Sequence, residues 1–248
     1  MTELRMGQGL RQNSRLSMAG LLYYPQAPRL KLPQGIFWSD VDVADVSFWQ
    51  GEIDFKKMSA SGISGVIIRA GQAVWKDRKF DDNWKGAREA GLPRGSYWFY
   101  DSRARPKDQA ELWCEALKRD PGELPFVVDY EENYGGRYAG WRNLYDFIEH
   151  LKARRVPAEK IWIYTGYWYW MAKGPKTAAQ LNYFKQYPLH IASYTTDPRR
   201  VRIPKPWTDA VMWQYGTPVE GVVRGVSSKE IDMNKFTGTE SDFQRLVR

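Results

Sequence analysis

Short runs of apolar and β-forming residues recur along the chain from Gly35 onward, and each run predicts a strand. Several runs are apolar without alternation, which is typical of parallel strands that are covered on both faces. In chain order the predicted strands are Trp38–Val46, Gly65–Arg69, Ser96–Tyr100, Leu124–Glu131, Ile161–Thr165, His190–Tyr194, Ala210–Tyr215 and Ile231–Phe236.

Helical patterns separate the first five of these runs. They cover Phe80 to Ala90, a segment opened by Pro106 that extends through Leu117, and Tyr138 to Leu151, where apolar residues follow the 3.6-residue period. Alternating strands and helices predict an α/β fold, a single (β/α) barrel of the TIM type. The last two gaps between strands are too short for a crossover helix, so the closing part should be irregular, with few helices and room for antiparallel pairing.

The first 34 residues differ from the rest of the chain. They are rich in Arg, Gln, Ser, Gly and Pro and have no sustained period, which predicts an arm or linker over 1–34 and a catalytic domain over 35–248. This segment carries five basic side chains and one acidic one, so it holds half of the formal net charge of +8. A basic surface attracts nucleic acid, anionic membranes or anionic wall polymers alike. No predicted helix carries basic residues spaced so that they could contact a groove of DNA, so no nucleic-acid partner is expected.

Several function classes lack the residues that they need. Cys114 is the only cysteine, which excludes an intrachain disulfide, and its apolar helical setting predicts a buried structural thiol. Two isolated histidines, His150 and His190, do not make a zinc site, so we expect neither a metal nor a cofactor. The apolar runs are too short for a membrane span. Met18–Leu22 is also too short for the core of a secretory signal, so we expect synthesis in the cytoplasm without export by that route.

Acidic residues fall repeatedly where predicted strands end, and in a barrel the reacting groups lie at those ends. They are Asp45, Asp129, Glu131 and Asp232. Asp129 and Glu131 are two residues apart on one strand, so their side chains share a face with Cβ atoms roughly 6.5–7 Å apart. Two carboxylates in a partly dehydrated cleft resist ionising together, so the pKa of one of them rises. Glycoside hydrolases use one protonated carboxylic acid beside an ionised carboxylate to cleave the glycosidic bond. Each acid alone could instead cap a helix or pair with an arginine.

The same residues lie within motifs that resemble a known family, the family-25 glycoside hydrolases or lysozyme-type N-acetylmuramidases. The resemblance runs from about Val41 to Phe236, and its specificity comes from the number, order and spacing of its segments. These are Asp45-Val46-Ser47-Phe48-Trp49-Gln50-Gly51 with Ile53-Asp54, Gly65-Val66-Ile67-Ile68-Arg69-Ala70, Ala90-Gly91-Leu92, Gly95-Ser96-Tyr97-Trp98-Phe99, Val128-Asp129-Tyr130-Glu131, Ile163-Tyr164-Thr165, Ala192-Ser193-Tyr194, Trp213-Gln214-Tyr215 and Ile231-Asp232-Met233-Asn234-Lys235-Phe236.

The resemblance implies a flattened, irregular barrel that hydrolyses the β-1,4 bond between N-acetylmuramic acid and N-acetylglucosamine in bacterial peptidoglycan. Glu131 matches the proton donor, and Asp129 matches the carboxylate that orients the substrate acetamido group or stabilises charge at the anomeric carbon. Asp45 and Asp232 match flanking acids of the cleft floor. The family retains configuration with help from the 2-acetamido group, and the wide estimated spacing of Asp129 and Glu131 is consistent with that, since a direct carboxylate nucleophile prefers about 5–5.5 Å.

Aromatic residues near strand ends are candidates for sugar contacts, because a flat apolar face with a polar handle suits a glycan cleft. The substrate-binding candidates are Tyr97, Trp98, Tyr164, Tyr194, Trp213 and Gln214. Many members of the resembled family have His at the position of Trp98, so one polar cleft contact could be lost or replaced here. The run Tyr167-Trp168-Tyr169-Trp170 could form a rim of the cleft or a short packed helix.

Two other functions remain open at this point. One is a non-catalytic glycan-binding or structural virion component on the same barrel, although the complete acidic set favours an enzyme. The other is a family-18 chitinase-like enzyme, whose lead-in to the acidic motif differs from Leu124-Pro125-Phe126-Val127-Val128. A wall hydrolase made without a secretory signal would be a phage or prophage lysin, released by a holin or carried on the virion. In the second case residues 1–34 would dock it to phage particle proteins.

Overall fold

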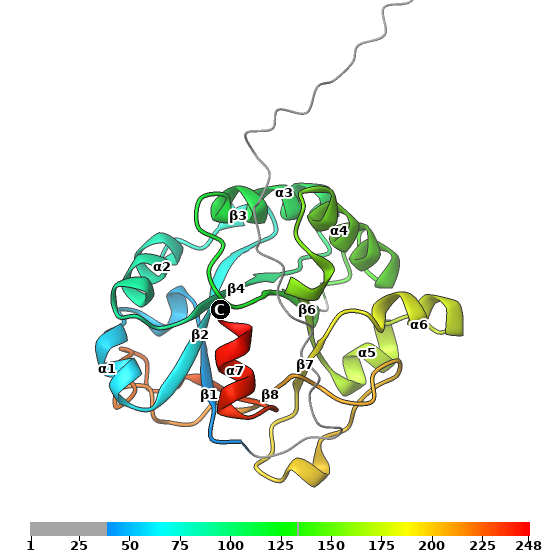
Figure 1. The fold of residues 1–248 in the computed structure, drawn as a ribbon. Coiled ribbons are helices and arrows are strands. Elements are labelled where there is room, and N and C mark those ends of the chain that lie inside the picture. The colour runs from blue at the N-terminus through cyan, green and yellow to red at the C-terminus, as the bar shows by residue number, and fades with distance from the viewer. Residues whose placement is uncertain (1–38, 133) are drawn as a thin grey trace, which may run out of the picture.

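A computed structural model describes residues 39–132 and 134–248, in which eight strands close into a barrel (Figure 1). The strand order around the barrel is β1-β9-β8-β7-β6-β5-β4-β2, and β1 pairs with β2 to complete it. The ninth strand, the two-residue β3, pairs only with β2. The strands are β1 (Asp42–Val46), β2 (Ile63–Gln72), β3 (Trp75–Lys76), β4 (Arg94–Phe99), β5 (Phe126–Asp129), β6 (Ile161–Gly166), β7 (Leu189–Ala192), β8 (Met212–Gly216) and β9 (Asp232–Phe236).

Among the eight strands of the barrel, the pairing changes direction only at β9. From β1 through β2, β4, β5, β6 and β7 to β8 all neighbours are parallel, whereas β9 runs antiparallel to both β8 and β1. All eight predicted strand regions therefore contain strands, and the prediction of an irregular closing part is confirmed. A parallel ninth strand would need a long crossover, and the 15 residues between Gly216 and Asp232 include no helix.

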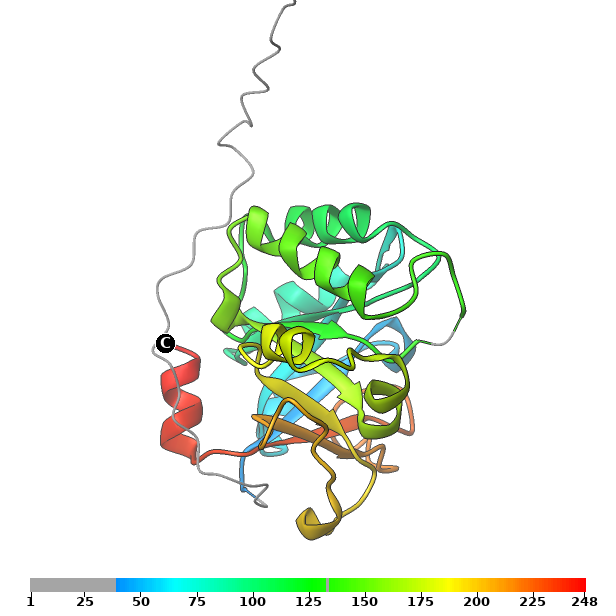
Figure 2. The same cartoon turned by 90° about the vertical axis from the view of Figure 1, so that its right-hand side faces the viewer.

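Except for α7, which lies across one end of the barrel, the α-helices lie around its outside and are concentrated beside its first strands (Figures 1 and 2). No α-helix lies between β7 and β9, where η4, a short 3-10 helix, is the one helical element of the described chain. The helices are η2 (Phe48–Gln50), α1 (Phe55–Ala60), α2 (Phe80–Glu89), α3 (Pro106–Leu117), α4 (Trp141–Ala153), η3 (Ala158–Lys160), α5 (Tyr167–Lys173), α6 (Ala178–Phe184), η4 (Pro198–Arg200) and α7 (Glu240–Leu246).

The alternation of side chains along each strand divides the core into two parts. One part, which includes Val128 and buried Cys114, lies between the strands and the helices. The other part, which includes Val127 and Trp162, fills the barrel interior. At the end where the parallel strands begin, α7 covers the interior: the Phe243 ring lies 5.5 Å from that of Phe236 (Figure 2). The opposite end, where the parallel strands terminate, is left for polar side chains.

Element bounds differ from the sequence predictions at several places. The predicted helices at Phe80 and Pro106 are confirmed, whereas the third begins at Trp141 rather than Tyr138. The fourth predicted strand was too long: β5 ends at Asp129, so Glu131 lies just beyond it. The predicted arm over 1–34 and the first residues of the predicted catalytic domain lie outside the described residues. Within the described part, no helix is long and apolar enough to cross a membrane.

Candidate active site

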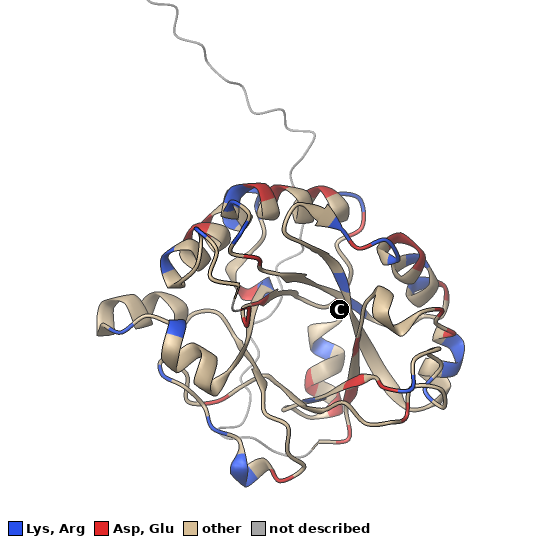
Figure 3. Cartoon of the chain, turned by 180° about the vertical axis from the view of Figure 1, so that it is seen from behind, with Lys and Arg blue, Asp and Glu red and all other residues tan. Residues whose placement is uncertain are grey.

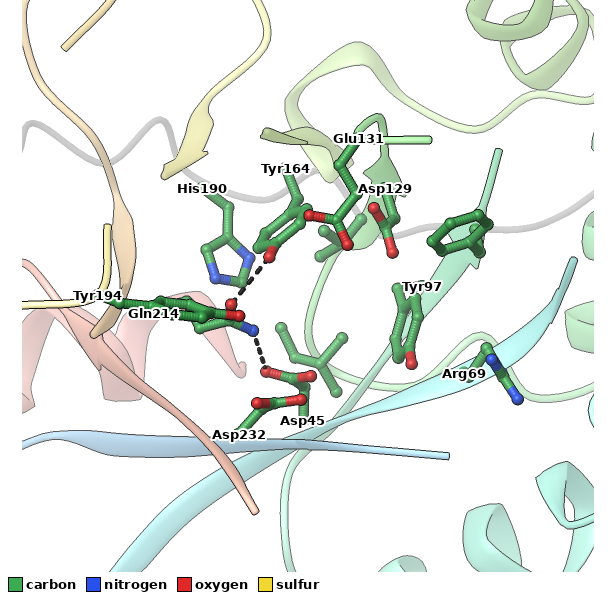
Figure 4. Close-up of a pocket in the computed structure, with 13 residues that line it drawn as sticks. Asp45, Arg69, Tyr97, Asp129, Glu131, Tyr164, His190, Tyr194, Gln214 and Asp232 are labelled. Atoms are coloured by element: carbon green, nitrogen blue, oxygen red, sulfur yellow. Dashed lines mark hydrogen bonds between the residues drawn. The ribbon is translucent and has the colours of Figure 1, made fainter. Parts of the chain in front are cut away.

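A pocket of about 190 Å³ opens at the carboxyl ends of the parallel strands (Figure 4). Its walls come from eight strands and from the residues that directly follow them, which brings side chains far apart in sequence to one place. The lining residues are Asp45, Ile67, Arg69, Tyr97, Phe99, Val127, Asp129, Glu131, Tyr164, His190, Tyr194, Gln214 and Asp232. All four acids expected at strand ends are therefore together in one pocket.

Asp129 and Glu131 form one side of this pocket and differ in their exposure to solvent. Asp129 is 6% exposed, and its Oδ1 has no hydrogen-bond partner among the described residues. Burial, followed by the charges of Glu131 and Asp45, raises the pKa of Asp129 well above its ordinary value. Glu131 is exposed as a residue but turns its carboxyl into the pocket, where desolvation raises the pKa of that carboxyl. Both shifts favour the neutral form of these carboxyls, so the two groups resist ionising together.

Asp45 and Asp232 form the opposite side of the pocket. They lie next to each other because they are directly paired residues of the neighbouring strands β1 and β9. Desolvation and the nearby charge of Asp232 raise the pKa of Asp45 to about 7. Burial also raises the pKa of Asp232, while a hydrogen bond of 2.9 Å from the Thr217 hydroxyl opposes the shift. The pocket thus holds two acidic pairs that face each other, and burial opposes the ionisation of all four carboxyls.

A chain of hydrogen bonds holds Asp45 in place across the barrel. The Tyr164 hydroxyl donates to Oε1 of Gln214 at 2.8 Å, and Nε2 of Gln214 donates to Oδ2 of Asp45 at 3.0 Å (Figure 4). Asn234 donates to the same oxygen at 2.9 Å from the other side. Burial lowers the pKa of His190 to about 4, so its ring is neutral and Nε2 donates to Oδ1 of Asn234 at 2.6 Å. These amides and rings fix one carboxylate oxygen.

Arg69 brings a cation to the acidic pocket from β2. Its Nε donates to Oδ2 of Asp77 at 2.8 Å, and its guanidinium lies 4.7 Å from the centre of the Phe48 ring. Arg69 is 6% exposed, and its positive charge partly offsets the rise in the pKa of Asp129. Asp77 also accepts from the backbone N–H groups of Phe48 and Lys79, which fixes the ion pair against the loop after β1.

The six substrate-binding candidates separate into two groups. Tyr97, Tyr164, Tyr194 and Gln214 line the pocket, whereas Trp98 and Trp213 do not. Both tryptophans are fully buried in the core between strands and helices, where Trp98 donates to Gln109 and Trp213 donates to the Ser193 carbonyl. The expectation that they contact sugar is therefore corrected. Trp98 follows inward-facing Tyr97 and Trp213 precedes inward-facing Gln214, so strand alternation turns each tryptophan outward.

The aromatic run after β6 forms helix α5, as the packed-helix alternative predicted. Trp170 is fully buried against Phe184 and Trp207, with ring centres 5.4 Å and 4.6 Å away. Trp168 is 71% exposed, so this helix also presents an aromatic face to solvent.

Some pocket residues were not among the sequence candidates, notably Arg69, Phe99 and His190. The period of two along each strand would have identified Arg69 from Ile67, and Phe99 from Tyr97, as members of the same inward face. His190 was considered only as a metal ligand. In residues 39–132 and 134–248, no group of three or more His, Cys, Asp or Glu side chains is arranged so that it could hold a metal ion.

A barrel that gathers four carboxyl groups at the ends of its parallel strands, with two on one strand end, has the architecture and chemistry of a glycoside hydrolase. The chain belongs to the glycosyl hydrolases family 25, whose family model matches residues 44–225.

Comparison with individual proteins agrees with this assignment. The chain is 31% identical to Lysozyme M1 of Streptomyces globisporus over 228 residues, which is 84% of this chain and 72% of that protein. It is 27% identical to the uncharacterized protein YegX of Escherichia coli O157:H7, over 82% of this chain and 72% of the relative. The crystal structure of the bacterial lysozyme from Streptomyces coelicolor superposes with a TM-score of 0.68 at 26% identity, covering 84% of this chain and 96% of that one. The protein is a lysozyme-type glycoside hydrolase, an enzyme of peptidoglycan cleavage.

Proposed function

We propose that the enzyme hydrolyses the β-1,4 bond between N-acetylmuramic acid and N-acetylglucosamine, with Glu131 as the general acid. The observation that carries this proposal is the placement of Glu131 beside Asp129 in a pocket that raises the pKa of both carboxyls. A general acid must hold its proton near the working pH and must reach the leaving oxygen. Glu131 suits this role, because desolvation raises the pKa of its carboxyl, and that carboxyl turns into the pocket while the residue remains open to solvent.

In this proposal Asp129 acts on the substrate's own acetamido group. Its Oδ1 is buried without a partner among the described residues, so a bound N–H donor would satisfy it. An acetamido N–H is such a donor, and an ionised Asp129 would orient the acetamido oxygen for attack on the anomeric carbon. The glycosidic bond would break as Glu131 gives its proton to the leaving oxygen, and water would then open the cyclic intermediate with Glu131 as base. Two displacements at one carbon retain its configuration.

The test is mass spectrometry of borohydride-reduced muropeptides released from purified peptidoglycan. Wild-type enzyme should release fragments with reduced N-acetylmuramic acid ends, and proton NMR of the first product should show the β-anomer. Glu131→Gln should slow release by roughly 10²- to 10⁴-fold, the usual contribution of a positioned acid. Glu89→Gln is the matched control, because it makes the same change on the exposed side of α2 and should retain full activity.

Three outcomes would contradict the proposal. Reduced N-acetylglucosamine ends would show that the other glycosidic bond is cut, and preferential cleavage of chitin oligomers would indicate a chitinase. Absence of release by wild-type enzyme from every wall type, at any pH, would indicate a glycan-binding protein rather than a hydrolase.

The charge of residues 1–34, a segment outside the described residues, supports a separate proposal about where the enzyme acts. We propose that this basic segment docks the hydrolase to phage particle proteins, so that the virion carries it to the bacterial wall. Mass spectrometry of purified virions should detect the chain, and deletion of 1–34 should remove it from particles while activity on isolated peptidoglycan persists. Particle association that survives the deletion would refute the docking role.

A further inference from the structure

A second hollow adjoins the active-site pocket in the segment that follows β7. It shares one wall with that pocket, because Tyr194 lines both. Tyr194 is 68% exposed and stands at the mouth of the active-site pocket (Figure 4). In Figure 3 the short helix η4 of this segment is the blue turn at the lower edge of the molecule. The lining residues are Ser193, Tyr194, Thr195, Arg199, Arg200 and Arg202.

Three arginines make this hollow basic, and two of them are oriented by their neighbours. Arg199 donates from Nε and Nη2 to Asp197, each at 2.9 Å, so one of the three charges is paired. The Arg202 guanidinium lies over the rings of Trp168 and Tyr167, 5.4 Å and 5.9 Å from their centres. A guanidinium that lies over an aromatic ring can still use its N–H groups to bind a ligand. Among the described residues, no acidic side chain lines the hollow.

The two cavities therefore have opposite charge on the two sides of Tyr194. Within the described chain, four carboxyl groups line the active-site pocket together with one cation, Arg69, which is paired with Asp77, whereas three arginines and no acidic side chain line the neighbouring hollow. Each muramic acid residue of peptidoglycan bears, through its lactyl ether, a short peptide with free carboxylates. The acidic pocket repels those carboxylates and the arginines attract them, so a bound glycan should turn its peptide toward the arginines.

We propose that the hollow lined by Arg199, Arg200 and Arg202 is a subsite for the carboxylates of the peptide stem. This inference rests on the proposed cleavage of peptidoglycan in the adjoining pocket. A stem attached to a sugar in that pocket needs only to pass Tyr194 to reach the arginines. Planar carboxylates fit the two-pronged donor edge of arginine, which favours Arg200 and Arg202 as the principal contacts. The subsite would make the enzyme prefer glycan with intact stems over bare glycan.

Equilibrium binding to the Glu131→Gln protein separates recognition from turnover. The probes are soluble glycan oligomers that carry tripeptide stems, and the same oligomers after an amidase has removed the stems. Stem-bearing oligomers should bind roughly five- to tenfold more tightly at low ionic strength, and this preference should shrink in high salt. Arg200→Gln with Arg202→Gln should abolish the preference without changing the affinity for bare oligomers. Lysine at both positions should restore part of it, because the charge returns without the planar fork.

The matched control is Arg119→Gln with Arg155→Gln. It removes the same charge from exposed positions just beyond the carboxyl ends of α3 and α4 and should leave the preference intact. Equal affinity of the parent protein for both oligomers would overturn the proposal, as would equal weakening of both by the Arg200/Arg202 variant. If that variant instead loses only binding of poly(glycerol phosphate), the hollow is a phosphate-polymer site and the stem proposal is wrong. Should wild-type enzyme release no sugar ends, the cleavage proposal fails, while the binding comparison still decides this one.

Discussion

Gln214 is bonded to Asp45 across the barrel, with 3.0 Å between its Nε2 and Oδ2 of the aspartate. The same amide accepts from the Tyr164 hydroxyl at 2.8 Å, so one glutamine connects β6, β8 and β1. Exchanging the oxygen and nitrogen of the Gln214 amide would break both hydrogen bonds. The two neighbours therefore fix the orientation of this amide. The acid pair on β1 and β9 is thereby coupled to the side of the pocket that carries Glu131.

Replacing Tyr164 by Phe should shift the pH dependence of the enzyme upward. Desolvation raises the pKa of Glu131, and hydrogen bonding by Tyr164 opposes that rise. Removing the hydroxyl should raise the pKa of Glu131 further, so the fall in kcat/KM at alkaline pH should occur at higher pH. The measurement is the pH profile of kcat/KM at constant ionic strength. Tyr145→Phe makes the same change on the outside of α4 and should leave the profile in place.

The wild-type profile itself should be bell-shaped. Activity should fall as pH rises through the pKa of the acid, because the protonated form of Glu131 is the active one. It should also fall as pH drops and the last ionised carboxylate takes up a proton. Since Asp45, Asp129, Glu131 and Asp232 all have raised pKa values, the acidic limb should lie above the range of an isolated aspartate. An activity that stays constant up to pH 9 would exclude Glu131 as the acid.

Asp45→Asn should stabilise the fold at pH 8 and have little effect on stability at pH 4. The pKa of Asp45 rises from 3.8 to about 7 in the folded protein, so between these values the folded state binds more protons than the unfolded state. Stability then decreases as pH rises through this window, and a neutral asparagine avoids the loss. Its amide oxygen can still accept from Gln214 and Asn234.

The expected gain at pH 8 is about 1–2 kcal/mol, or roughly 3–6 °C in Tm. Calorimetry at pH 4, 6 and 8 measures it. Asp81→Asn, at an exposed position on α2, should change stability little at all three values. A gain of equal size at every pH would mean that Asp45 titrates normally.

Trp98→Phe should reduce stability without reducing affinity for glycan. The indole is fully buried behind the pocket wall, so the change leaves unfilled volume and removes one of the two hydrogen bonds to Oε1 of Gln109, which still accepts from the Asp101 N–H, at a cost of about 1–3 kcal/mol. Denaturant unfolding and glycan binding, both in the Glu131→Gln background, measure the two effects. Tyr194→Ala should show the reverse, because this exposed side chain forms the mouth of the pocket. Weaker glycan binding by Trp98→Phe would restore its predicted contact role.

The sequence allowed the barrel and its acids to be predicted because both follow from local patterns. Asp45 and Asp232 each end up in the pocket as expected, and the pairing of β1 with β9 explains why they meet. Helix α7 was not predicted, although the capping box between Thr239 and Asp242 marks its start. Its seven residues are too few to show a helical period against the surrounding polar residues.

Other features could not be obtained from local patterns. The outward direction of Trp98 follows from strand alternation, but a strand flanked on both faces by apolar residues does not reveal which face is the barrel interior. The buried ion pair between Arg69 and Asp77 depends on a tertiary contact. Asp77 directly follows β3 and accepts a hydrogen bond from the backbone of Phe48 in η2. The neutral state of His190 comes from its burial in the closed barrel, and its hydrogen-bond partner Asn234 is 44 residues away in sequence.

The position of β9 has a consequence for biosynthesis. The strand that separates β8 from β1 is among the last parts of the catalytic barrel to leave the ribosome, and it carries Asp232. A nascent chain that ends before residue 232 therefore lacks one acid and leaves the first strand without one of its two neighbours. Prematurely terminated products should therefore lack hydrolytic activity, because the same strand closes the barrel and completes the acidic pocket.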